Sequence, residues 1–267
     1  MPGCAALPVV AREAAGLLKR VGIFTATRWE QEAVSRAILI EERARVGGVS
    51  CVIGRRGACR VSVFRTGMGP VKAGAVSREA LASCSLDLAI SSGFACALTS
   101  SQIGDLLIGT DVSPWPAGIC SVELSGSVPC SVELQAVALE SARRAGVAVQ
   151  AGRFVSVSHV LWRAEEKQRV AAGTGAVGLD MESAALGAIA KGRRVPFLVA
   201  RTVSDLLDED LPLDFNLFLT PKTWPQGLWQ VARRPSCLSG ILRLRRQSQA
   251  AAVRLTRFME AFLNDTR

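Results

Sequence analysis

The sequence predicts an α/β domain built on a central sheet with helices packed on it. Short apolar or alternating segments, typical of strands, take turns along the chain with longer segments of helical periodicity. Three strand segments run into turns that carry glycine or serine, after Thr66, Ser91 and Val203. Strand ends line the ligand crevice in open α/β sheets, so we expect the functional site at these turns.

The first part of the chain contains four predicted strands and two predicted helices. The strands cover residues 21–26, 60–66, 86–91 and 105–112. One helix begins at Trp29, with Ala33, Ile38 and Leu39 among its apolar positions. The other follows Pro70, a residue that suits the first turn of a helix.

The second part begins with a loop over residues 113–129, which is rich in proline and glycine. Strand and helix patterns resume after it, so it is not a domain linker. Residues 132–145 and 163–172 are predicted helices, the latter charged and exposed, and residues 154–160 alternate as a strand does. A small-residue helix then precedes an apolar strand that ends in Arg201-Thr202-Val203-Ser204-Asp205.

The overall composition fits one folded domain with a basic tail. The 267 residues suit a single large α/β domain, and no apolar run is long enough to span a membrane. The first residues lack the charged start of a secretory signal, so we expect a cytoplasmic protein. The net charge of +9 is concentrated in residues 233–259, which hold seven arginines and no acid. One histidine, and eight cysteines without metal-ligand spacing, lead us to expect no metal and no cofactor.

Each candidate site residue has a structural alternative. The turn at Gly67 and Gly69 can face an anion or a sugar, or can simply need positive φ; without a third glycine it does not favour a dinucleotide. Asp205 can be a general acid or a helix N-cap. Glu182 can bind a diol or interact with the dipole of its helix, and Glu30 and Glu32 can lie on a solvated helix face.

Four segments together resemble the nucleoside phosphorylase and nucleosidase superfamily. They are RTGMGPVKAG, ISSGFACALTSSQIGDLLIGTDV, GLDMESAALGAIA and RTVSD, in the family's order and spacing from about residue 21 to 210. The resemblance implies a three-layer αβα fold with a central mixed, twisted sheet, to which this chain adds a C-terminal helical segment. It also implies a homodimer or larger oligomer that cleaves N-ribosidic bonds.

The resemblance assigns roles to individual residues. Asp205 would protonate the purine at N7 while Ser204 orients it. Glu182 would bind the ribose hydroxyls, and Met181 would pack on the sugar. The remaining substrate-binding positions it implies are Gly67, Gly69, Gly93, Phe94 and Val160, the last reading the purine edge through its backbone groups.

Hydrolysis and phosphorolysis both stay open. Phosphorylases of the family carry a G-D-P-x-R-type phosphate loop, where this chain reads TATRWEQEA from residue 25. That segment is more similar to the nucleosidases' G-A-M-E-E-E-V, whose last Glu activates water. Glu30 falls at that position, with Glu32 as the alternative. Arg28 can still bind phosphate, which would then be a co-substrate.

The tail distinguishes the chain from ordinary nucleosidases, which end soon after their last catalytic strand. We therefore divide it into an N-terminal extension (1–20), a catalytic domain (21–222) and a basic helical extension packed on that domain (223–267). In the extension Leu244, Ala251, Leu255, Phe258 and Phe262 recur at helical spacing. They would face either an anionic membrane surface or the domain itself, and we expect no nucleic-acid partner.

This combination resembles the hopanoid-associated branch of the family, which removes adenine from adenosylhopane. The expected reaction releases adenine and leaves ribosylhopane, at the inner membrane surface. An apolar pocket would then be lined from Leu206, Leu207, Leu211, Leu213, Phe215 and Phe218. The alternatives are a nucleosidase for methylthioadenosine, adenosylhomocysteine or futalosine, a purine nucleoside phosphorylase, and a nucleoside-binding protein without catalysis.

Overall fold

The structure, a computed structural model, describes residues 19–115, 126–219, 221–233 and 237–265. Nearly all of the predicted N-terminal extension, and most of the predicted loop over residues 113–129, therefore lie outside the described residues.

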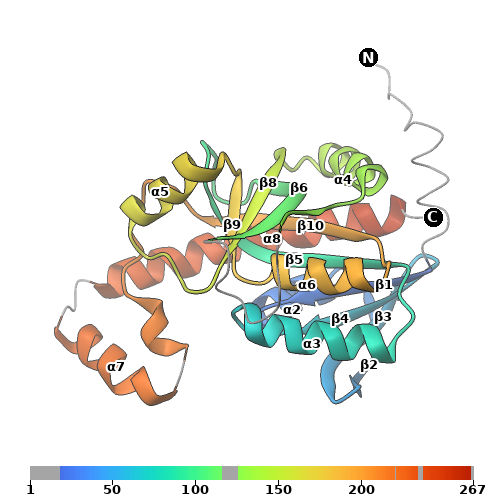
Figure 1. The fold of residues 1–267 in the computed structure, drawn as a ribbon, viewed down its shortest axis with the longest axis horizontal. Coiled ribbons are helices and arrows are strands. Elements are labelled where there is room, and N and C mark those ends of the chain that lie inside the picture. Colours follow the sequence, from blue (N-terminus) through green and yellow to red (C-terminus); the bar gives the residue numbers. More distant parts are fainter. Residues whose placement is uncertain (1–18, 116–125, 220, 234–236, 266–267) are drawn as a thin grey trace.

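The described chain forms one sheet with helices on both sides (Figure 1). The strands are β1 (Arg20–Thr25), β2 (Leu39–Val46), β3 (Val49–Arg56), β4 (Cys59–Arg65), β5 (Leu88–Ala97), β6 (Leu106–Trp115), β7 (Val128–Pro129), β8 (Val149–Val157), β9 (Gly178–Asp180) and β10 (Phe197–Asp205). The helices are α2 (Arg28–Ser35), α3 (Pro70–Ser83), α4 (Val132–Arg144), α5 (Ala164–Thr174), α6 (Ser183–Gly192), α7 (Trp224–Arg233) and α8 (Cys237–Asp265), with 3₁₀ turns η1 (Phe215–Phe218) and η2 (Pro221–Thr223).

The sheet is mixed, as predicted, and β5 is its centre. This strand pairs in parallel with β1 and β10 and antiparallel with β9. The further pairings β10–β6, β6–β8 and β8–β9 close five strands into a ring. Because β5 and β10 run in parallel, with Val203 opposite Ala95 and Asp205 opposite Cys96, their carboxyl ends meet at one place.

Alternating strand residues fill two separate cores, which confirms the three-layer αβα prediction. On one side Ile90 and Leu198 pack in the same cluster as residues of α2, α4 and α8. On the other side Ala89 and Phe197 join residues of α3 and α6. Successive side chains of a strand point to opposite faces, so a central strand such as β5 or β10 contributes to both cores.

The hairpin of β2 and β3 is missing from the sequence-based prediction. Leu39 does not belong to the helix that begins near Trp29, because α2 ends at Ser35 and Leu39 starts β2. The turn between the strands contains Gly47 and Gly48, both with positive φ (55° and 78°). A Gly-Gly pair between two such segments is a hairpin signal, so the sequence did carry the information.

The second half of α8 packs against the domain. Ala251, Leu255, Phe258 and Phe262, four of the five apolar positions predicted at helical spacing, are completely buried. They belong to the same core cluster as residues of α2 and α4, so the packing alternative holds for this stretch and the membrane alternative does not. No helix among the described residues is long and apolar enough to cross a membrane.

Candidate active site

The site is organised around Arg201, a buried arginine in the middle of β10 that is 1% exposed. Its Nη1 donates to the Phe94 carbonyl at 2.9 Å, and its Nη2 donates to Ser91 Oγ at 3.0 Å. Burial alone would lower the pKa of Arg201, but the surrounding carboxylates, Asp180 foremost, raise it. The guanidinium is therefore a permanent cation inside the fold.

Three carboxyl groups surround this guanidinium. Asp180 Oδ2 lies 2.8 Å from Arg201 Nε, Glu182 Oε2 lies 3.3 Å from Nη2, and Glu30 Oε1 lies 4.0 Å from Nη1. Asp180 is also held by the backbone N–H groups of Glu182 and Ser183, each at 3.2 Å, and thus fixes the start of α6. The cluster contains more negative than positive groups.

Glu182 stands at the N-terminus of α6, but its carboxylate does not cap that helix. Its Oε1 accepts the backbone N–H of Gly69 at 2.8 Å, which ties α6 to the turn that precedes α3. Gly69 has a φ of 96°. A Cβ added at this glycine would lie 3.8 Å from the methyl group of Met181. Burial raises the pKa of Glu182 to about 7, with Asp180 and Glu30 adding to the rise and Arg201 opposing it.

Glu30 stabilises the start of its own helix and also belongs to the site. It closes a capping box with Thr27, whose backbone N–H donates to Glu30 Oε2 at 2.6 Å. Its Oε1 accepts the backbone N–H of Phe94 at 2.8 Å, and the side chain is buried. Gly93 makes this approach possible, because a Cβ there would lie 2.2 Å from Glu30 Oε1. Glu32, by contrast, pairs with Arg28 at 2.8 Å between two exposed side chains.

Asp205 ends β10 next to a second buried cation. Lys167 Nζ donates to Asp205 Oδ2 at 3.0 Å, and Ser204 Oγ lies 3.1 Å from Asp205 Oδ1. The Asp205 side chain is 16% exposed, so one side of the carboxyl group is open. No helix begins at Asp205, since residues 206–214 are not helical, and the N-cap alternative therefore does not apply.

Val160 presents both of its backbone polar groups to one side chain. The carboxamide of Asn216, in η1, accepts the Val160 N–H at 2.8 Å and donates to the Val160 carbonyl at 2.9 Å. An amide that accepts and donates side by side has the same pattern as the edge of an adenine base. Gly67, the remaining predicted position, lies two residues before Gly69 with a φ of 79°.

The structure therefore brings most of the predicted residues into two neighbouring groups. Glu30, Phe94, Gly69 and Glu182 meet around Arg201, while Ser204 and Asp205 meet Lys167 at the end of the same strand. The site thus combines a partly exposed carboxyl group at the end of β10 with buried carboxyl groups, on α2 and at the N-cap of α6, that can accept hydrogen bonds from hydroxyl groups.

Sequence reasoning missed three polar residues of this region. Lys167 was predicted to lie on an exposed helix but is completely buried. Arg201 gave a usable signal, since an arginine inside an apolar strand indicates a buried ion pair. Asn216 gave none, because its contact with Val160 spans 56 positions of the chain.

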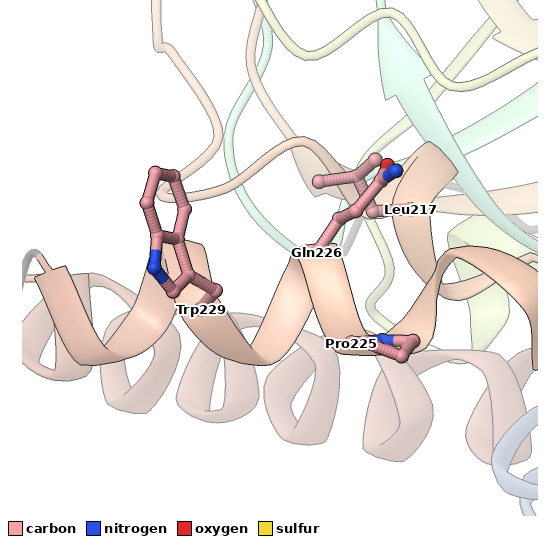
Figure 2. Close-up of a pocket in the computed structure, with 4 residues that line it drawn as sticks. All are labelled: Leu217, Pro225, Gln226 and Trp229. Atoms are coloured by element: carbon pink, nitrogen blue, oxygen red, sulfur yellow. The ribbon is translucent and has the colours of Figure 1, made fainter.

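An apolar pocket of about 550 Å³ adjoins η1. Figure 2 shows its lining residues, in which Leu217 of η1 lies beside Gln226 of α7, with Pro225 and Trp229 along the same helix. Asn216, which contacts the Val160 backbone, and Leu217, which lines this pocket, are neighbours in η1. The pocket and the Val160 backbone groups therefore both adjoin the same short turn.

The chain resembles proteins of known activity over most of its length. Residues 20–220 match the family profile described as the Phosphorylase superfamily. A 5′-methylthioadenosine/S-adenosylhomocysteine nucleosidase of Haemophilus ducreyi is 25% identical over 210 residues, which cover 75% of this chain and 90% of that protein.

Solved structures share the fold. The corresponding nucleosidase of Neisseria meningitidis, in complex with methylthio-immucillin-A, superposes with a TM-score of 0.74 at 20% identity, covering 94% of this chain and 100% of that chain. The native futalosine hydrolase of Helicobacter pylori superposes with a TM-score of 0.74 at 17% identity, covering 93% and 98%.

Proposed function

Because the chain belongs to the phosphorylase superfamily, we propose that it cleaves the N-ribosidic bond of an adenine nucleoside and releases the base. The observation that carries the proposal is the presence of two differently held carboxyl groups, Glu182 at the N-cap of α6 and Asp205 at the end of β10. Glu182 is a buried carboxyl group held by Gly69 and Arg201, and Asp205 is a partly open carboxyl group held by Lys167.

The two carboxyl groups divide the work on the substrate. Asp205 gives a proton to N7 of the leaving purine, and Ser204, whose Oγ lies 3.1 Å from Asp205 Oδ1, helps to orient the base. Glu182 accepts hydrogen bonds from the ribose hydroxyls, and Met181 packs on the sugar. The backbone N–H and carbonyl of Val160 form hydrogen bonds with the edge of the base. The base thereby replaces the Asn216 carboxamide, which forms these bonds in its absence.

Water is the proposed nucleophile. Glu30 lies 4.0 Å from Arg201, in the same cluster as Glu182, and is the proposed base for that water. Arg28, the residue that would bind phosphate, instead pairs with Glu32, and its side chain is 77% exposed. The arrangement therefore favours hydrolysis over phosphorolysis.

Adenosylhopane is the proposed substrate, leaving ribosylhopane. An apolar group at the ribose 5′ position needs apolar surface near the site. Of the residues predicted to line that pocket, Leu213 is buried and the others are half-buried: Leu206, Leu207, Leu211, Phe215 and Phe218. The pocket between η1 and α7 extends this surface. Methylthioadenosine or adenosylhomocysteine is the second candidate, favoured by the activity named for the Haemophilus ducreyi relative.

We assign membrane contact to α7 and the start of α8, since the second half of α8 is buried. Trp224, Trp229, Leu238 and Leu242 are each more than half exposed. Arg233, Arg243, Arg245 and Arg246 lie on the same two helices. Exposed tryptophans with basic residues are typical of contact with an anionic lipid surface.

An adenine-release assay tests the activity. Adenosylhopane and methylthioadenosine are each offered with and without phosphate, with Asp205→Asn as the inactive control. We expect adenine release without phosphate, and a loss of roughly 10²–10⁴-fold in Asp205→Asn, the usual contribution of a general acid. Absence of base release from both nucleosides would contradict an enzymatic role, and dependence on phosphate would contradict hydrolysis.

A further inference from the structure

Lys167 is a buried lysine whose position is unusual for an α5 helix that otherwise carries its charges outward. Its side chain is 0% exposed, whereas Glu165 and Arg169 on the same helix form an exposed ion pair. Burying an ammonium group is costly unless it is paired and hydrogen-bonded. The groups that pair with the Lys167 ammonium therefore indicate what its buried charge stabilises.

All three donors of the Lys167 ammonium are used. They reach Asp205 Oδ2 at 3.0 Å, the Leu206 carbonyl at 3.0 Å and the Glu209 carbonyl at 2.9 Å. Burial by itself lowers the pKa of Lys167, but the charge and hydrogen bond of Asp205, together with Cys96 and Glu209, more than offset this and the pKa is raised. Lys167 is therefore a fixed cation, and Asp205 Oδ2 is permanently engaged.

We propose that Lys167 is a positioning residue for proton transfer by Asp205, an inference that rests on the proposed function. With Oδ2 engaged by Lys167, Oδ1 is the oxygen beside Ser204 that turns toward the substrate. As the C–N bond breaks, its electron pair moves onto the base and the carboxyl proton of Asp205 moves to a base nitrogen. Water adds to the anomeric carbon and gives its proton to Glu30. The carboxylate left on Asp205 then lies 3.0 Å from the ammonium, which stabilises that negative charge as it forms.

A purely structural role is the competing explanation. The bonds to Leu206 and Glu209 tie the segment after β10 to α5, and losing them alone could loosen the site. The two explanations differ in one respect. A positioning role matters only when the leaving group needs a proton, whereas a structural role matters for every substrate.

Two substrates separate these roles. Methylthioadenosine needs a proton on its leaving base, and p-nitrophenyl β-D-ribofuranoside has a leaving group that departs as a stable anion. For Lys167→Met we expect kcat on methylthioadenosine to fall about 10-fold to 100-fold, below the full effect of a general acid. Cleavage of the p-nitrophenyl riboside should stay near the wild-type rate. Lys167→Arg, which keeps the charge, should recover part of the loss, and Lys191→Met, at an exposed lysine in α6, should change neither rate.

A double-mutant cycle tests the positioning role independently. It needs only methylthioadenosine, so it also applies if the wild type does not cleave the p-nitrophenyl riboside. Lys167→Met should have little further effect in an Asp205→Asn background, because the group it acts through is gone. Equal losses on both substrates, or full additivity with Asp205→Asn, would overturn the positioning role and leave the proposed function intact. A wild type that releases adenine from neither adenosylhopane nor methylthioadenosine would instead overturn the proposed function. Lys167→Gln, a polar side chain without charge, replaces Lys167→Met if the latter does not fold.

Discussion

The Asn216 carboxamide should compete with the adenine base for the backbone of Val160. It accepts the Val160 N–H at 2.8 Å and donates to the Val160 carbonyl at 2.9 Å. If the base uses these same two groups, it has to displace the side chain first. Asn216→Ala removes the competitor and should tighten adenine binding. The cap of η1 by Asp214 survives the change, because Asp214 Oδ1 also accepts the backbone N–H of residue 216 at 3.0 Å.

The size of the effect follows from the two hydrogen bonds. Each neutral hydrogen bond contributes about 1 kcal/mol net, so the pair favours the occupied state by about 2 kcal/mol. Tenfold in affinity corresponds to about 1.4 kcal/mol, which makes the open state roughly 30-fold rarer than the occupied one. Apparent affinity scales with the fraction of the binding-competent state, so Asn216→Ala should lower the Kd for adenine by up to about 30-fold.

Isothermal titration with free adenine measures this directly. Asn264→Ala is the matched control, since Asn264 accepts a hydrogen bond from Arg56 at 3.1 Å and lies in α8. Its Kd for adenine should equal that of the wild type. An unchanged or weaker Kd in Asn216→Ala would show that Asn216 does not occupy the base position, and the assignment of Val160 to the purine edge would lose its support.

Three further results are expected. Glu30→Gln should lower the free energy of unfolding by about 1–3 kcal/mol in a denaturant titration, and should also lower activity. The reason is that Thr27 N–H and Phe94 N–H both donate to this side chain, whereas an amide has one acceptor oxygen. Unchanged stability would contradict the capping role. For Glu182, a pKa raised by burial from 4.5 to about 7 contributes stability that is fully present below pH 4.5 and is lost as the pH rises through about 7. The melting temperature should therefore fall between pH 5 and pH 8, less so in Glu182→Gln, and equal slopes would contradict the raised pKa. Replacing Trp224 by serine should weaken sedimentation with anionic vesicles without affecting methylthioadenosine cleavage, and unchanged sedimentation would exclude this tryptophan from membrane contact.

Much of the fold could be predicted because its strands are short, apolar and separated by clear helical patterns. The strand that ends at Asp205 and the helix that starts after Glu182 were both anticipated, since each depends on local periodicity. The tail was harder. Leu255 and Phe258 have the spacing of an amphipathic helix whether the apolar face meets lipid or the domain, and only the burial of both residues decides between the two.

The burial of Lys167 could not be predicted from local sequence patterns. Lys167 occupies a helix rich in exposed charges, and nothing in its neighbours distinguishes it from Arg169 on the same helix. Its burial results from the packing of α5 against the end of β10 and the segment that follows, through contacts that span 38 to 42 positions. Periodicity locates elements, but the pairing of a charge with its partner is fixed by the tertiary arrangement of those elements.

The two cations also differ in the balance of charge around them, and this difference suits the proposed reaction. Lys167 forms its ion pair with one carboxyl group, that of Asp205, so this pair is neutral once the proton has left. Arg201 faces three, Glu30, Asp180 and Glu182, so the sugar side carries an excess of negative charge, which is greater when Glu182 is ionised. A ribosyl group gains positive charge as its bond to the base breaks, and preorganised negative groups stabilise that charge. The raised pKa of Glu182 limits the excess in the empty site, and a substrate that develops positive charge there would favour its ionised form.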